Sequence, residues 1–147
     1  MATGSKEKPA VGGEFKQYKK DFSAEKLTSY QNLPELISMF TYYKDLWNDF
    51  GDPFFSAMYA STDIDRLNTE LIVVATLALR GYRTGLIHHT LLALREGATP
   101  RQIRGAILIT LATGGFAACS PGLAWADEVL IPFENGDLNL KELYPDD

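Results

Sequence analysis

Residues 65–103, with the sequence DRLNTELIVVATLALRGYRTGLIHHTLLALREGATPRQI, decide the fold. From Leu71 to Leu79 the chain is apolar almost all round a helix, which predicts a central, buried helix. Gly81 is a natural end for this helix. A second helix is expected from about Thr84 to Glu96, because Gly97 follows it. Since only a short turn joins the two helices, we expect them to lie antiparallel and side by side.

The end of the same stretch carries the start signal of a third helix. Thr99 is a good N-cap residue, Pro100 suits the first helical position, and Gln102 completes a capping box. Apolar residues from Ile103 onwards continue this helix up to the glycines at 114 and 115.

The rest of the chain extends the helical pattern in both directions. Upstream, apolar residues at helical spacing follow Pro34, and the sequence Gly51-Asp-Pro is expected to end that helix. Downstream, a last helix is predicted over about 121–130, followed by a polar, acidic tail over 131–147. Neither strand alternation nor an internal repeat is visible. The prediction is therefore an all-α bundle of about five to seven helices.

The length of 147 residues fits one ordinary domain. The polar residues 1–13 are predicted to form a disordered tail, and they lack the apolar segment of a signal peptide. We expect residues 14–147 to form a single helical domain. The longest apolar run, Leu71–Leu79, is too short to span a bilayer, so no membrane partner is expected.

Charge and cysteine content exclude several classes of function. The formal net charge is −5 and the pI is about 5.0, which disfavours nucleic acid and anionic membranes as partners. Cys119 is the only cysteine, so neither an intramolecular disulfide nor a Cys-x-x-Cys site can form. A reducing, cytoplasmic setting is therefore expected.

Two adjacent histidines, His88 and His89, are the first candidates for chemistry. Neighbouring residues are about 100° apart around a helix, so both cannot point into one small pocket. His89 shares its helical stripe with Leu86 and Ala93. A histidine on a helix is more often structural than catalytic, and this interpretation stays open beside the catalytic one.

Glu70 is the second candidate, because it lies beside the most apolar run of the chain and needs a partner there. One interpretation pairs it with Arg66, one helical turn earlier. The other has Glu70 reach His89 on the following helix, and a Glu–His pair in a closed pocket is a workable general base.

Metal and thiol chemistry have weaker support. The carboxylates around His88 and His89 lack the i,i+3 or i,i+4 spacing of helical ligand pairs, so no metal site is predicted. Cys119 lies among Ala117, Ala118 and Ser120, which is typical of a small buried residue.

Four segments of the chain resemble one known family. They are RLNTELIVVA (66–75), LRGYR (79–83), HTLLALREGATPRQI (89–103) and ADEVL (126–130). Together they are similar to the carboxymuconolactone decarboxylase family, part of the alkylhydroperoxidase-like superfamily, over about residues 51–130. The resemblance implies an all-α fold that assembles as a trimer or hexamer, with sites between subunits.

The chain departs from both well-known branches of that family. The alkylhydroperoxidase-like branch has Glu, then Cys-x-x-Cys, then His. Glu70 and His89 match its outer positions, but Tyr82 and Gly85 stand where the two cysteines belong. Peroxide reduction by a dithiol is therefore the least expected activity. The decarboxylase branch has a carboxylate where this chain has Gly85, which predicts more room and a bulkier substrate, as in secondary metabolism.

The resemblance and the residues together predict a cofactor-free lyase, decarboxylase-like or cyclase- or isomerase-like. Its substrate would be a small organic molecule with a carbonyl or carboxylate group. His89 would be the general acid/base and Glu70 its partner, while Arg83, Tyr82 and His88 would bind substrate. The alternative is a non-catalytic member of the family that binds a ligand or serves assembly.

Overall fold

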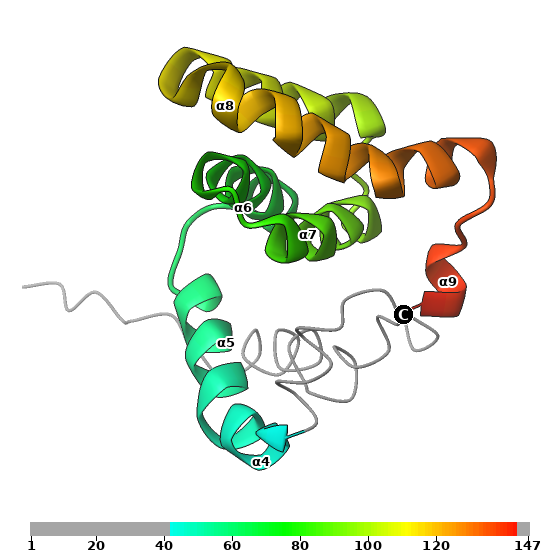
Figure 1. Cartoon of the computed structure of the whole chain (residues 1–147). Coiled ribbons are helices and arrows are strands. Elements are labelled where there is room, and N and C mark those ends of the chain that lie inside the picture. The colour runs from blue at the N-terminus through cyan, green and yellow to red at the C-terminus, as the bar shows by residue number, and fades with distance from the viewer. Residues whose placement is uncertain (1–41, 144–147) are drawn as a thin grey trace, which may run out of the picture. The chain divides into compact units, whose positions relative to one another are not determined.

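The structure, a computed structural model, describes residues 42–143, and every regular element in this range is helical (Figure 1). The predicted all-α class is thereby confirmed. The chain divides into two compact units, and the boundary between them in the sequence falls between Thr62 and Asp63. The predictions for residues 1–13 and for the helix start at Pro34 lie outside the described residues. The single domain over 14–147 stays a prediction.

The first unit continues as a helix through the sequence that was expected to stop it. Helix α4 (Lys44–Leu46) leads into a π-helical turn, η1 (Trp47–Gly51), and then into α5 (Asp52–Ala60). The predicted end at Gly51 is wrong, because its backbone is helical, with φ −66° and ψ −56°. A Cβ on Gly51 would lie 2.4 Å from the ring of Trp47, so the glycine admits this ring.

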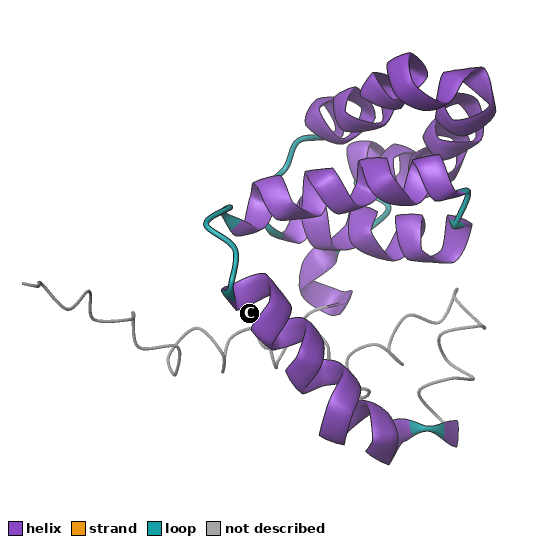
Figure 2. Cartoon of the chain, turned by 90° about the vertical axis from the view of Figure 1, so that its left-hand side faces the viewer, coloured by secondary structure: helices purple, strands orange, loops and turns teal. Residues whose placement is uncertain are grey.

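The second unit contains α6 (Arg66–Arg80), α7 (Arg83–Arg95), α8 (Pro100–Asn135) and α9 (Leu140–Leu143), joined by short connections (Figure 2). Helices α6, α7 and α8 pack on one another. Their predicted signals are confirmed. Gly81 ends α6 in the left-handed conformation, with φ 66°, and Thr99 and Gln102 form the capping box of α8.

The central helix of this unit is α7 rather than α6. Nearly all of α7 from Thr84 to Leu94 is buried, and its Leu86 and Leu92 belong to the fully buried core. The prediction that α6 is buried all round is wrong for one of its faces. Ile72 is 52% exposed and Leu79 is 45% exposed. The apolar composition of α6 therefore predicted correctly that the helix packs in the core, but it did not show which of its faces stays exposed.

Helix α8 is a hairpin of two arms that lie side by side (Figure 1). Gly115 reverses the chain with φ 67° and ψ −168°, a combination that is essentially restricted to glycine. A Cβ on Gly122 in the second arm would lie 2.9 Å from that of Ala78 and 3.1 Å from Cγ2 of Ile107, so glycine permits close packing there. Arg104 joins the arms through ion pairs of 2.8 Å to both Asp127 and Glu134.

The second arm corrects two predictions about the C-terminal part of the chain. It begins directly after Gly115 and continues to Asn135, so Pro121 lies inside the helix instead of starting it. The expected tail over 131–147 begins with the last turn of α8 and includes α9. A second proline, Pro132, also lies inside this arm. Helical packing around Val129 and Leu130, both buried, outweighs the single backbone hydrogen bond that each of the two prolines removes.

Helix α8 is also the one helix of residues 42–143 that is long and apolar enough to cross a membrane, by length and composition alone. The core helix of a soluble protein meets the same criteria. In this fold Gly115 turns the helix back on itself and the cross-hairpin ion pairs of Arg104 hold the two arms together. It is therefore a hairpin and not one continuous rod.

Candidate functional site

Helix α6 places two charged residues on one face, one turn apart. Asp65 is its N-cap, and its carboxylate accepts hydrogen bonds from the backbone N–H of Asn68 at 2.9 Å and from its side-chain amide at 2.6 Å. These bonds lower the pKa of Asp65. Because the cap fixes where α6 begins, Arg66 is its first residue and Glu70 lies one turn later on the same face.

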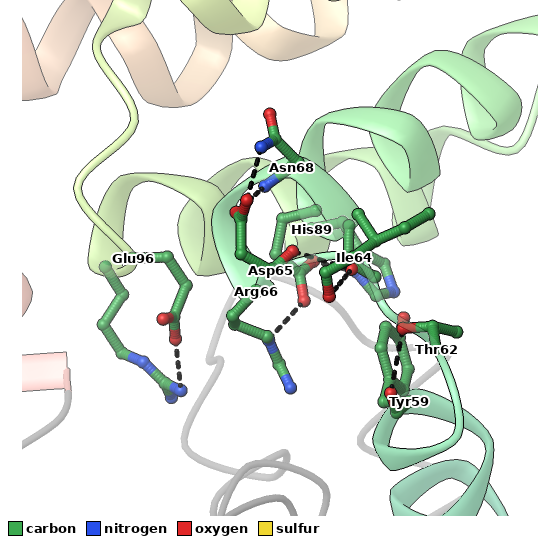
Figure 3. A network of polar contacts seen from close by, with 11 residues as sticks. Tyr59, Thr62, Ile64, Asp65, Arg66, Asn68, His89 and Glu96 are labelled. Carbon is green, nitrogen blue, oxygen red and sulfur yellow. Dashed lines mark hydrogen bonds and ion pairs between the residues drawn. The ribbon is translucent and has the colours of Figure 1, made fainter.

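Glu70 is fully buried and contacts both residues that the sequence offered as partners. Its Oε1 lies 2.9 Å from Nε of Arg66, and its Oε2 lies 2.7 Å from Nδ1 of His89 on α7. Figure 3 labels these two partners, Arg66 and His89. The two interpretations of Glu70 are therefore not exclusive. The three side chains form one chain of contacts, which we call the Arg66–Glu70–His89 triad.

The contact with Glu70 decides which nitrogen of His89 carries the proton. A carboxylate only accepts hydrogen bonds, so Nδ1 of His89 is the donor. In a neutral imidazole the other nitrogen, Nε2, is then an acceptor with a lone pair. The side chain of His89 is 15% exposed, whereas that of Glu70 is not exposed at all. His89 is therefore the member of this pair that can exchange a proton with another molecule.

His88 lies beside His89 but is almost completely buried. The two rings are nearly perpendicular, with centroids 5.1 Å apart. Burial lowers the pKa of His88 well below its usual value, and the nearby charges of His89, Arg95 and Arg66 act in the same direction. His88 is therefore neutral at physiological pH. Its predicted role in binding substrate stays a prediction.

The ring of Tyr82 lies over Gly85. A Cβ on Gly85 would be 2.7 Å from one ring carbon of Tyr82, 2.8 Å from the next and 3.3 Å from a methyl group of Leu77. The backbone N–H of Tyr82 donates to the carbonyl of Leu77 in the turn that ends α6, which brings the ring to this place. The expectation that Gly85 leaves room for a bulky substrate is therefore wrong, because Tyr82 occupies that space.

This arrangement predicts that Tyr82 and Gly85 are energetically coupled. In the Tyr82→Ala protein, Gly85→Ala should stabilise by up to about 1 kcal/mol, because alanine favours a helix over glycine. With Tyr82 present, the added methyl group meets the ring, and overpacking of about 1–3 kcal/mol offsets that gain. Urea unfolding of the four proteins should give a coupling energy equal to this overpacking, about 1–3 kcal/mol. A coupling energy near zero would show that the ring moves away freely.

Arg83, the first residue of α7, lies at the surface and is engaged by another side chain. Its Nε donates to a carboxylate oxygen of Glu128 on α8 at 3.2 Å, and its Nη2 forms an ion pair with the other oxygen. Both side chains are about half exposed. The structure thus gives Arg83 a carboxylate partner, and its predicted role in binding a substrate carboxylate stays a prediction. Glu128 was not singled out from the sequence.

The described residues give little support to a metal site or to thiol chemistry. Within residues 42–143 no group of three or more His, Cys, Asp or Glu side chains is placed to hold a metal ion. Cys119 is buried in α8, as its small neighbours predicted.

Comparison with known proteins yields one family. The model of the carboxymuconolactone decarboxylase family matches residues 45–128, which is more than half of the chain. No curated protein and no solved structure matches significantly. The matched range includes the whole Arg66–Glu70–His89 triad and the Tyr82–Gly85 contact. The helical fold and this match together show that the chain belongs to the carboxymuconolactone decarboxylase family.

Proposed function

We propose that this chain is a cofactor-free lyase that acts on a small organic substrate with a carbonyl or carboxylate group, with His89 as the general acid/base. The 2.7 Å contact between Nδ1 of His89 and the buried carboxylate of Glu70 carries the proposal. An imidazole held by a carboxylate keeps one tautomer and one orientation, as a general base requires.

The reaction follows from the free lone pair on Nε2 of His89. In an isomerisation or cyclisation, Nε2 takes a proton from the carbon next to a carbonyl group, and the imidazolium, stabilised by Glu70, returns it elsewhere. In a decarboxylation, Nε2 takes the proton of a β-keto acid. The bond to the carboxylate carbon then breaks, CO2 leaves, and its electron pair forms an enolate. The imidazolium protonates the carbon of this enolate, which restores neutral His89.

Three further residues complete the proposed site. Arg83 binds a substrate carboxylate by exchanging it for Glu128, which is feasible because this ion pair is half exposed and therefore weak. The ring of Tyr82 packs over Gly85, which lies one helical turn before His89, and forms an apolar wall there. His88 lies behind His89 as a neutral ring.

A non-catalytic, ligand-binding or assembly role is the second candidate. It is favoured by the replacement of both cysteine positions of the related redox branch by a tyrosine ring packed on a glycine. Reduction of peroxides by a dithiol is the least supported activity, because Cys119 is the only cysteine of the chain and it is buried. Ligand binding without any turnover would distinguish the binding role from the lyase.

The test of the lyase proposal is a panel of small β-keto acids, unsaturated lactones and enolisable ketones. Release of CO2 and solvent-deuterium incorporation are followed for the wild type and for His89→Gln. The proposal requires that the wild type turns over at least one compound and that the variant loses most of that activity. Equal turnover by both proteins would contradict it.

We further propose that the chain is a cytoplasmic homo-oligomer, a trimer or hexamer. An apolar surface patch around the turn of α8 at Gly115 would hold its subunits together. Phe116, 78% exposed, and Ile109, 71% exposed, are the most exposed members of this patch. Leu79 of α6 joins it, because its Cδ2 methyl group lies against Gly114, 2.6 Å from where a Cβ on that glycine would be. Apolar patches of this kind mark protein–protein contacts.

For this proposal we expect light scattering after size-exclusion chromatography to give three or six times the monomer mass for the wild type. Phe116→Glu should shift the protein to the monomer, because it places a charge in the patch. Ile131→Glu, at a half-exposed position on the second arm of α8, serves as the matched control and should leave the assembly intact. A monomeric wild type would overturn the proposal.

A further inference from the structure

The charges of the Arg66–Glu70–His89 triad compensate one another. Arg66 contributes one positive charge and the carboxylate of Glu70 one negative charge, and these two balance when the imidazole of His89 is neutral. The side chain of Arg66 is 12% exposed and that of Glu70 is not exposed. Little water is therefore available to stabilise the carboxylate, and most of the compensation must come from its two partners.

The two partners of Glu70 differ in whether their charge is permanent. A guanidinium keeps its proton under all ordinary conditions, whereas an imidazole gains or loses one near neutral pH. Without Arg66, the buried carboxylate would be left with a neutral imidazole 2.7 Å away. The least costly way to neutralise it would then be the uptake of one proton, either as imidazolium on His89 or as the acid form of Glu70.

We propose that Arg66 is a positioning residue that sets the proton count of the Glu70–His89 pair. Its ion pair with Glu70 holds the pair at a single proton, on Nδ1 of His89, and so keeps Nε2 available as a base at neutral pH. The inference rests on the proposed function only for its catalytic consequence. The proton count is a property of the resting protein.

Other charged and titratable groups near this pair do not replace Arg66 in compensating the charge of the Glu70 carboxylate. On α7 these groups are His88 and Arg95. His88 is neutral because it is buried. Arg95 forms its own ion pair with Glu96 at 3.1 Å. Only Arg66 contacts a carboxylate oxygen of Glu70 from the same helix, at the i,i+4 spacing that favours such pairs.

Nuclear magnetic resonance of the free protein tests the proposal without a substrate. The chain has two histidines, so the side-chain ¹⁵N signals of His88 and His89 are assigned with a single His88→Gln variant. The carboxyl ¹³C signal of Glu70 is recorded in the same samples near pH 7. The variants are Arg66→Met and Arg66→Gln, which remove the charge, and Arg66→Lys, which keeps it. Arg95→Met is the matched control, because it removes the other nearby guanidinium.

The wild type should show neutral His89 with its proton on Nδ1 and an ionised Glu70. Arg66→Met or Arg66→Gln should show one extra proton on the pair, and Arg66→Lys and Arg95→Met should resemble the wild type. A folded Arg66→Gln protein with unchanged signals would overturn the proposal, as would proton uptake in Arg95→Met. If the signals change as expected but no compound is turned over by the wild type, the proposed function fails while this inference stands.

Discussion

Replacing His89 by glutamine is expected to reduce kcat for the substrate identified by the panel by about 10²- to 10⁴-fold, the usual contribution of a general acid/base. The reason is the geometry of α6 and α7. Glu70 orients His89 through Nδ1, so Nε2 is the atom that exchanges protons with the substrate. Glutamine is similar in size to histidine and still donates a hydrogen bond to Glu70, but it cannot take up a proton near neutral pH.

Steady-state kinetics of purified protein provide the measurement, and Cys119→Ser provides the control. Cys119 is buried in α8 and has no part in the proposed chemistry, so its replacement should leave kcat unchanged. A His89→Gln protein with wild-type turnover would refute the role of His89. A large loss in Cys119→Ser would instead favour thiol chemistry.

Replacing Glu70 by leucine is expected to have the largest effect on stability, a loss of about 3–5 kcal/mol. Glu70 is completely buried, and Arg66 is nearly so. Leucine leaves the guanidinium of Arg66 inside the protein without this carboxylate, and it removes the partner of Nδ1 of His89. Breaking one side of a buried ion pair costs far more than the pair itself contributes.

Urea unfolding followed by circular dichroism measures this loss, with Glu128→Gln as the matched control. Glu128 also forms an ion pair with an arginine, but both side chains are about half exposed, so we expect a loss of at most about 1 kcal/mol. The double variant Glu70→Leu, Arg66→Met should recover much of the loss, because both buried charges are then absent. Equal losses of unfolding free energy for Glu70→Leu and Glu128→Gln would show that burial does not make the Arg66–Glu70 ion pair more costly to break.

The helix boundaries that were predicted well depend on local signals. Gly81 and the Thr99–Gln102 capping box act within a few residues of the chain, and both occur in the structure. The wrong helix boundaries occur where side-chain packing, or contact with a distant part of the chain, decides where a helix ends. Gly51 was taken for a helix stop, yet it remains helical against the ring of Trp47. Pro121 was taken for a helix start, yet Gly115 restarts the helix earlier.

The candidate site was predictable in part. The residue types and spacing of Arg66, Glu70 and His89 marked them as possible partners, because i,i+4 pairing and a short turn between helices are local features. Sequence could not show that Glu70 uses both of its oxygens at once, one for each partner. Nor could it show that the ring of Tyr82 fills the space over Gly85, since this depends on how the turn after α6 directs the side chain.

The sequence by itself determined that the chain is helical, that His89 and Glu70 are its candidates for proton transfer, and that its single cysteine cannot form a dithiol pair within the chain. These properties follow from periodicity, capping residues and residue types, which are local. Only the tertiary structure decided that α7 is the central helix, that α8 folds back at Gly115, and that Arg66 joins the Glu70–His89 pair. These depend on which faces pack together and how much water is excluded, and both are properties of the assembled helices.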